Sequence, residues 1–317
     1  MRTRISQTAL PFCILVVLVV ISALASVGYR GGNEWLPVLG GLGNAAFLEN
    51  LFVSIPLLFL SILAIFSGLY VVLLKTNSID FGQTSIILLL IMAANPYSLH
   101  FNSIYPVMAC MIWFQFCFLE NQIFASFILL SLGSLFYAPA IWFILAFTIL
   151  LTVSGTPDPL RTLVKAFGGA CLPHLYLLVF RWIIFDDAGV YLYHFMGQIL
   201  EIGSPFHLIR MPQYFMFLLL LYILVRAISF FYIKSPKGIL EYLLKTDLWM
   251  MVSALIIFLL FYNSTAPMLF AIVSLPASIM LSYYFKNCEK VSRTNVEFLL
   301  LVCGLLICCI SYVVITP

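Results

Sequence analysis

Charged side chains are scarce in this sequence. Asp, Glu, Lys and Arg make up 9% of its 317 residues, whereas about a quarter is usual in soluble proteins, and hydrophobic residues make up 64%. This balance excludes a soluble protein and predicts a chain that crosses a membrane several times. The net charge of +3, with basic residues dispersed over short segments, excludes a nucleic-acid-binding surface.

The sequence also lacks the common metal and disulfide patterns. Its eight cysteines never form Cys-x-x-Cys and lie mostly inside apolar runs, so we interpret them as small packing residues. Its four histidines form neither His-x-x-x-His nor His-Glu-x-x-His. We therefore predict no metal site, and the sequence identifies no cofactor.

Residues 123–155 contain no charged side chain and would form a helix about 50 Å long, against a membrane hydrocarbon core of about 30 Å. Proline removes a backbone donor and disfavours helix in the preceding residue. We therefore predict a break at Tyr137-Ala138-Pro139 and a hairpin of two short spans. Both ends of this hairpin then face the same side of the membrane.

The other apolar runs complete an all-α, polytopic transmembrane bundle that forms a single domain over residues 1–317. We predict about eleven spans, with the N-terminus inside and the C-terminus outside. Besides the two in 123–155, they are 9–27, 51–74, two within 83–119 on either side of a polar turn at 95–103, 161–185, 212–233, 248–262, 267–285 and 296–315. The first run also resembles a signal peptide with Ala23-Leu24-Ala25 at its cleavage site, but we favour an uncleaved span.

Basic residues test this topology, because they gather on the inner side of membrane proteins. Of the 15 basic residues, the inner side receives Arg2, Arg4, Lys75, Arg161, Lys165, Lys234, Lys237, Lys245, Lys286, Lys290 and Arg293. Only Arg30, Arg181 and Arg210 lie outside, and Arg226 lies within a span. Nine spans, with 83–119 and 123–155 each crossing once, keep the same bias, and the polar turn at 95–103 argues against that alternative.

Three ionisable residues lie within or at the edge of apolar runs, where such groups are candidates for function. We expect Arg226 to extend to the inner headgroups, since it lies about 10 Å along a helix from the end of its span. Arg181 can reach the outer headgroups or the following Asp186 and Asp187. His174 has no histidine partner at helical spacing, and we interpret it as a hydrogen-bonded core residue.

The outer loops hold the candidate binding residues. The longest, 186–211, interleaves acids and histidines with aromatic side chains, which suit contacts to sugars. We predict that this loop folds into short helices over a cavity opened by the first outer loop. The candidate substrate-binding residues are Arg30, His100, Asp186, Asp187, His194, Glu201, His207 and Arg210.

Residues 9–185 resemble the N-terminal module of the GT-C glycosyltransferases, membrane enzymes that take sugars from polyprenyl-phosphate donors. A first span, an outer loop with an acid, a second span and short hairpins follow one another in the same order. The local sequence is similar at Asn95-Pro96 with Leu99 and Ser103, at 132–142, and at the basic segment and span 161–182. The chain also resembles uncharacterised bacterial integral-membrane proteins.

The GT-C resemblance implies a multi-pass protein of the bacterial inner membrane that transfers a sugar from a polyprenyl-phosphate donor in cell-envelope glycan assembly. It places the catalytic carboxylate at Glu34, as general base or metal-assisted activator of the acceptor hydroxyl. The long outer loop and the hairpins of 212–317 would then follow the GT-C-like module. The alternatives are a non-catalytic subunit or scaffold with membrane-protein partners, and a transporter.

Overall fold

The computed structural model describes residues 51–76, 78–93, 104–153, 158–200, 211–260, 266–288 and 294–304, and no strand occurs among them. The all-α prediction is confirmed for these residues. The helices are α3 (Leu51–Thr76), α4 (Phe81–Ala93), α5 (Ile104–Leu119), α6 (Ile123–Phe136), the short η2 (Ala138–Ala140), α7 (Ile141–Val153), α8 (Pro159–Phe185), α9 (Ala188–Leu200), α10 (Met211–Lys234), α11 (Ile239–Leu260), α12 (Ala266–Asn287) and the helix Thr294–Gly304.

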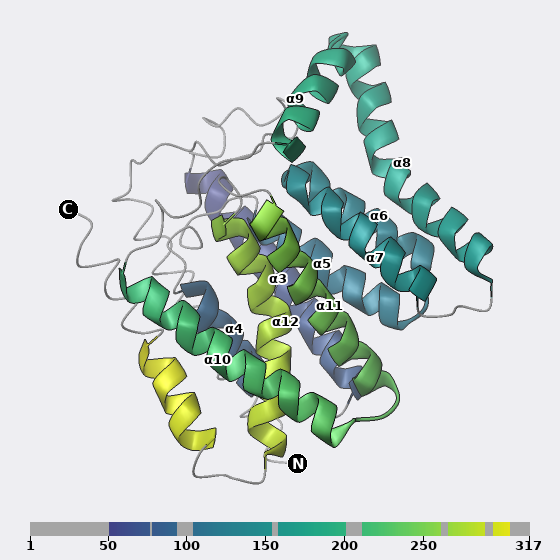
Figure 1. The fold of residues 1–317 in the computed structure, drawn as a ribbon. Coiled ribbons are helices and arrows are strands. Elements are labelled where there is room, and N and C mark those ends of the chain that lie inside the picture. The colour runs from purple at the N-terminus through teal and green to yellow at the C-terminus, as the bar shows by residue number, and fades with distance from the viewer. Residues whose placement is uncertain are drawn as a thin grey trace.

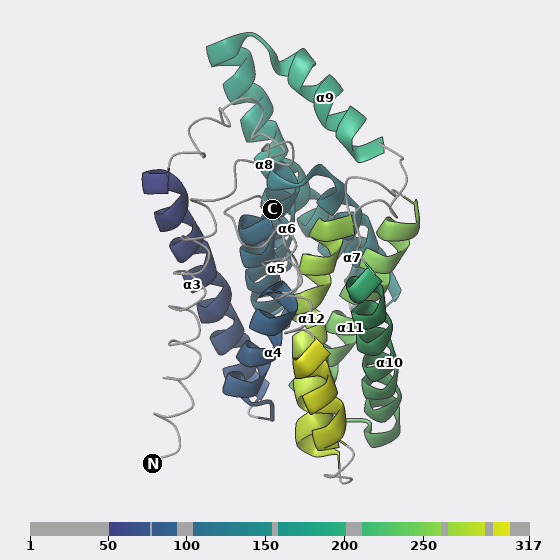
Figure 2. The same ribbon diagram turned by 90° about the vertical axis from the view of Figure 1, so that its left-hand side faces the viewer.

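Most of these helices lie side by side as a bundle, with α8 at one edge and α9 across its end (Figures 1 and 2). At one end of the bundle, Lys75 of α3 pairs with Glu120, directly after α5, at 2.7 Å. Phe118 of α5 stacks on Tyr242 of α11 at the same end, with ring centroids 5.6 Å apart. We call this the basic end. The opposite end carries η2, which α9 covers.

The chain breaks at the predicted position in 123–155. Helix α6 stops at Phe136, Tyr137 has extended backbone angles, and Pro139 lies in η2 before α7 begins. Phe114 of α5 contacts Phe127 of α6 and Phe147 of α7, with ring centroids 6.5 and 4.5 Å apart. Helix α7 therefore folds back beside α6, and the predicted hairpin is confirmed.

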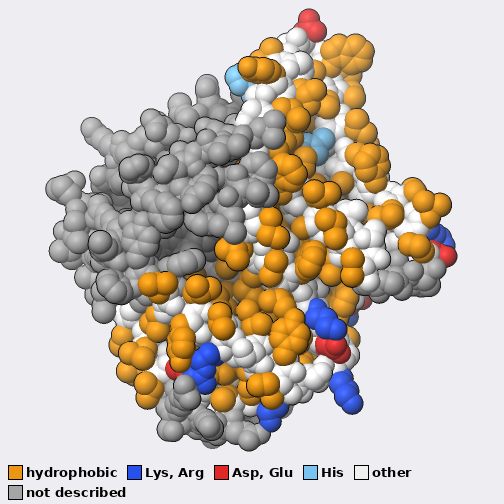
Figure 3. Space-filling view, viewed as in Figure 1, with side chains coloured by type: hydrophobic (Ala, Val, Ile, Leu, Met, Phe, Trp, Pro, Cys, Tyr) orange, Lys and Arg blue, Asp and Glu red, His pale blue; other side chains and the backbone are white. Residues whose placement is uncertain are grey.

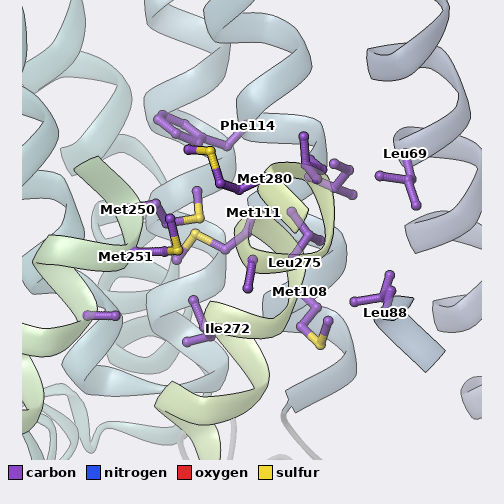
Figure 4. Packing of buried hydrophobic residues seen from close by; sticks show 14 of the residues in the cluster. Leu69, Leu88, Met108, Met111, Phe114, Met250, Met251, Ile272, Leu275 and Met280 are labelled. Atoms are coloured by element: carbon purple, nitrogen blue, oxygen red, sulfur yellow. The ribbon is translucent and has the colours of Figure 1, made fainter. Parts of the chain in front are cut away.

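The centre of the bundle is packed with flexible apolar side chains. Methionines from α5, α11 and α12 meet there, together with Phe114 and aliphatic residues (Figure 4). Thioether side chains fill irregular gaps between helices, which suits a bundle whose helices differ in length. The residues labelled in this core are Leu69, Leu88, Met108, Met111, Phe114, Met250, Met251, Ile272, Leu275 and Met280.

Two described segments, Pro56–Thr76 and Pro159–Phe185, are long and apolar enough to cross a membrane. They differ in their surroundings, since 44% of an apolar 18-residue stretch of the first is buried in the protein, against 22% of such a stretch of the second. Helices α4, α5, α6 and α7 are apolar but have 13 to 16 residues, which corresponds to about 20–24 Å.

Two segments differ from or refine the sequence-based prediction. Helix α11 begins at Ile239, nine residues before the predicted span, so Lys245 and Asp247 are helical and not in a loop. Glu241 and Lys245 form an i,i+4 ion pair at 2.6 Å, which supports the helix in this polar stretch. In the segment predicted to be the long outer loop, residues 188–200 form α9, a short helix as predicted, and 201–210 lie outside the described residues.

Candidate functional site

The segment from the end of α8 through α9 holds three of the predicted binding residues, Asp186 and Asp187 in the turn between the helices and His194 within α9. Asp186 ends α8 in the left-handed conformation, with φ of 52°, which aspartate adopts more readily than most residues. This turn brings Asp187 back toward the last turns of α8. We call residues 181–199 the α8–α9 corner.

Arg181 and Asp187 form a two-point ion pair at this corner. Arg181 Nε donates to Asp187 Oδ1 at 2.9 Å and Nη2 donates to Oδ2. The arginine side chain is only 8% exposed, and its guanidinium lies over the Tyr191 ring, 5.2 Å from the ring centroid. Nη1 is buried and has no hydrogen-bond partner. The pair is thus neutral overall but keeps one charged donor group for a further acceptor.

Helix α9 covers the tip of the α6–α7 hairpin with one apolar face. Tyr191, Phe195 and Ile199, each four residues apart, are buried against Ala138 of η2. Burial raises the pKa of the Tyr191 phenol, and the Arg181 guanidinium opposes that rise. His194 lies on the exposed side of α9 beside Tyr193, so the structure does not bring it to Asp187.

His174 lies between α6 and α9 and is hydrogen-bonded, as predicted for a core residue. Its Nε2 lies 2.9 Å from Ser134 Oγ, and its ring lies 5.0 Å from the Phe195 ring. Ser134 Oγ also donates to the Ser131 carbonyl at 2.7 Å, and with that bond made, a protonated His174 Nε2 is the donor to Ser134. In this tautomer the histidine does not take the serine proton.

An apolar groove lies between α6 and α8. Its volume is about 480 Å³, and it is open to the outside of the bundle. Its walls are Ile128, Leu132 and Leu135 of α6 and Leu172, Pro173, Tyr176, Leu177 and Phe180 of α8. Pro173, Leu177 and Arg181 follow one another at intervals of four residues, so one stripe of α8 leads from the groove to the buried guanidinium.

Gly169 allows α6 and α8 to approach each other closely on the N-terminal side of this groove. A Cβ atom there would lie 2.5 Å from the Phe124 carbonyl oxygen. Ser131 Oγ donates to the Ala170 carbonyl at 2.6 Å and fixes the two helices further along. Residues 124, 131 and 134 of α6 thus face 169, 170 and 174 of α8, which shows that the two helices run in the same direction.

Six predicted site residues lie outside the described residues, so the structure does not place them. They are the catalytic candidate Glu34 and the binding candidates Arg30, His100, Glu201, His207 and Arg210. The predicted cavity shared by Glu34 and the long outer loop is therefore untested. In the described part of the chain, no three His, Cys, Asp or Glu side chains gather where they could hold a metal ion.

Arg226, which we predicted to extend to the inner headgroups, has a partner within the protein that the sequence did not indicate. Its guanidinium donates through Nη1 to Glu297 Oε1, in the helix Thr294–Gly304. Tyr284 of α12 donates to the other oxygen of Glu297 at 2.8 Å. The Glu297 side chain is only 8% exposed, so solvent screens its attraction to Arg226 less than it would at the surface.

Sequence reasoning also missed a buried polar pair in the core, Gln115 of α5 and Asp247 of α11. Neither residue has exposed surface. The signal was present, since Gln115 is the one amide in the apolar run 104–119 and Asp247 directly precedes another apolar run. Nothing in the sequence indicates that two residues 132 positions apart meet.

The groove and the α8–α9 corner follow one another along α8. The groove has an apolar lining that suits an apolar chain, and Arg181 lies one turn beyond Leu177, with Nη1 buried outside that lining. Comparison of this chain with protein-family models, with curated proteins and with solved structures finds no match.

Proposed function

We propose that this chain is a multi-pass protein of the bacterial inner membrane. Apolar side chains cover the outside of α8, with Phe167, Tyr176 and Trp182 each about two-thirds exposed or more (73%, 70% and 67%). Lys and Arg side chains lie away from the α8–α9 corner on the face in Figure 3. Such a distribution suits an inner side at the basic end of the bundle, where α3 and α5 finish, and an outer side at the α8–α9 corner.

The proposed topology has about eleven spans with the N-terminus inside. Helices α10, α11 and α12 have 22 to 24 residues, about 33–36 Å, which is the length that a complete crossing needs. The hairpin α6–α7 is shorter than the hydrocarbon core. We infer that its tip ends below the outer surface, where α9 covers it and shields η2 from lipid.

Within that membrane protein, we propose a site for a polyprenyl-phosphate-linked sugar, used in cell-envelope glycan assembly. The isoprenoid chain lies in the α6–α8 groove, and a phosphate oxygen accepts a hydrogen bond from Arg181 Nη1. The observation that carries this proposal is the stripe from Pro173 through Leu177 to a buried guanidinium with an unpartnered donor. By its GT-C resemblance, Glu34 would deprotonate the acceptor hydroxyl.

Lipid binding by the detergent-purified chain tests the groove. Native mass spectrometry with a polyprenyl phosphate should show a bound lipid in the wild type and at least a ten-fold weaker complex in Leu177→Trp, because the indole fills the groove. Ile183→Trp is the matched control, since Ile183 is 73% exposed on the same helix and does not line the groove. Equal binding by both variants would exclude the groove as the lipid site.

A second comparison tests the head-group contact. A polyprenol without phosphate should bind the wild type more weakly than the phosphate does. The double variant Arg181→Gln with Asp187→Asn removes both charges together, so no buried charge is left without a partner, and it should bind the two lipids equally. A preference for phosphate that survives in this variant would exclude Arg181 as the phosphate contact.

The second candidate function is a non-catalytic subunit or scaffold of an envelope complex. This function is favoured because most of the described carboxylates are bound to other side chains of the protein and are not free for catalysis. Glu120, Asp187, Glu241 and Glu297 are ion-paired, and Asp247 is bonded to Gln115. A stoichiometric protein partner that co-purifies without polyprenyl phosphate would favour this function over the transferase.

A further inference from the structure

The contact between Gln115 and Asp247 is buried on all sides. Gln115 Nε2 donates to Asp247 Oδ1 at 2.5 Å, and this bond joins α5 to α11. The other two polar oxygens of the pair, Asp247 Oδ2 and Gln115 Oε1, are buried and have no hydrogen-bond partner. Buried oxygens are normally paired, so two unpaired oxygens in one contact require an explanation.

Counting donors identifies what is missing. An ionised carboxylate only accepts hydrogen bonds, and so does the carbonyl oxygen of a glutamine side chain. The two unpaired atoms are therefore both acceptors, and one proton supplies a donor for both. Placed on Asp247 Oδ2, a proton turns that atom from an acceptor into a donor, and Gln115 Oε1 is the unpaired acceptor in the same contact.

We propose that Asp247 is a proton-binding site, and that the protonated acid and the Gln115 amide form a pair of hydrogen bonds that joins α5 to α11. The proton is a ligand of the folded bundle in the same sense as a bound ion. This inference is independent of whether the chain transfers sugars.

Among the described residues, no charged side chain pairs with Asp247 to balance an ionised carboxylate. Its neighbours Met250 and Met251 lie in the methionine-rich core beside Met111 and Phe114 of α5 (Figure 4). Lys245 of the same helix is 58% exposed and pairs with Glu241. An ionised carboxylate in such a setting is costly, whereas a neutral acid bonded to an amide is not.

The helices that pack against α11 carry few titratable groups, and none has a hydrogen bond or ion pair to Asp247 in the described part of the chain. Helix α7 has none in its sequence. On the other packed helices they are Tyr70 and Lys75 of α3, Tyr105, Cys110 and Cys117 of α5, and Tyr283, Tyr284 and Lys286 of α12.

A metal cation in place of the proton fits the contact less well. Ca²⁺ and Mg²⁺ take about six oxygen ligands or more. Only Asp247 Oδ2 and Gln115 Oε1 are unpaired oxygens in this contact, and the adjacent side chains of Met250 and Met251 are poor ligands for hard cations. A proton needs no more than these two oxygens.

Infrared difference spectra between the full-length purified wild type and its variants test the proposal directly. The wild type at neutral pH should show the carbonyl band of a protonated carboxylic acid, which Asp247→Asn removes. Gln115→Leu should shift this band, because it removes both hydrogen bonds to the acid. Asp158→Asn is the matched control, since Asp158 is exposed and makes no side-chain cap, and it should leave the band unchanged.

Stability against pH gives a second readout. If the folded protein holds a proton that the unfolded chain releases, the wild type loses stability as pH rises above about 4, where an ordinary aspartate ionises. Asp247→Asn carries its own donor and should lack this loss, so the variant gains Tm relative to the wild type as pH rises.

Three results would overturn the proposal. The first is a wild type without a protonated-acid band at neutral pH. The second is an Asp247→Asn variant whose Tm difference from the wild type is the same at every pH. The third is wild-type stabilisation by sodium, calcium or magnesium chloride over choline chloride that Asp247→Asn abolishes, which would assign a cation to the site. If Asp247→Asn does not fold, the band and its shift in Gln115→Leu decide the matter.

Discussion

Arg226 and Glu297 pair across two helices, with Tyr284 on the far oxygen of the carboxylate. Arg181, which is buried, pairs with Asp187 only six residues away. The two arginines show two ways of keeping a charge inside an apolar bundle. Arg181 uses a partner just after the end of its own helix. Arg226 uses a partner on a separate helix, which only the complete fold brings close.

At the residue scale, Glu297→Gln should be strongly destabilising. The change leaves the Arg226 charge inside the bundle without a counter-charge, at a cost of about 2–4 kcal/mol, because Arg226 is only 25% exposed. Lys75→Met is the control, since the Lys75–Glu120 pair is 43% and 34% exposed and should contribute less than about 1 kcal/mol. Thermal unfolding in detergent measures both, and equal losses would contradict a buried role for Glu297.

The catalytic assignment of Glu34 is also a prediction about one residue. Glu34→Gln removes a charge with little change of shape, so a catalytic Glu34 changed in this way should abolish envelope-glycan assembly while protein abundance stays normal. The measurement is complementation of a deletion strain, with abundance followed by immunoblot. Full function of the Gln variant would end the catalytic assignment and leave the scaffold function in the lead.

At the scale of elements, the packing of α8 on α6 depends on two adjacent glycines that differ sharply. A Cβ at Gly169 would lie 2.5 Å from the Phe124 carbonyl oxygen, whereas at Gly168 the nearest atom would be a Phe124 ring carbon at 3.6 Å. The first separation is a clash with backbone, and the second is an ordinary contact. The two positions therefore form a matched pair for testing how closely these helices must approach.

Gly169→Ala should lower the free energy of unfolding by about 1–3 kcal/mol, because α8 must move away from α6. Gly168→Ala should be neutral or stabilising by up to about 1 kcal/mol, because alanine favours helix without a clash. Thermal unfolding of the two variants in one detergent gives the comparison. Similar Tm values for both would show that α6 and α8 do not pack as closely as described.

Sequence reasoning predicted the elements whose signals are local. The proline in Tyr137-Ala138-Pro139 predicted the break at 137–140, and the length of the apolar runs predicted α3 and α8. The predicted start of α11 was nine residues too late, because charged residues such as Lys245 and Asp247 indicate a loop as long as their partners are unknown. Those partners, Glu241 and Gln115, lie on the same helix and across the bundle. Contacts between distant residues carry no signal in a single sequence, which is why the partners of Asp247 and Arg226 were missed.

At the scale of the whole molecule, the number of spans is the main prediction. Single cysteines at positions 78, 103, 154 and 235, each replacing serine in a background without native cysteines, report the side on which each segment lies. Eleven spans predict that only the cysteine at 103 reacts with an impermeant reagent from outside. A cysteine at 103 that reacts from neither side would instead support nine spans, because 83–119 would then cross once.

The partner of Arg226 lies 71 residues further along the chain. A ribosome adds about 5–20 residues per second, so α10 waits about 4–14 s between its own synthesis and that of Glu297. In the proposed topology, α10 then lies in the membrane during that interval with its guanidinium lacking the Glu297 carboxylate. Chains released before residue 297 keep this defect permanently, and we expect membrane quality-control proteases to remove them first.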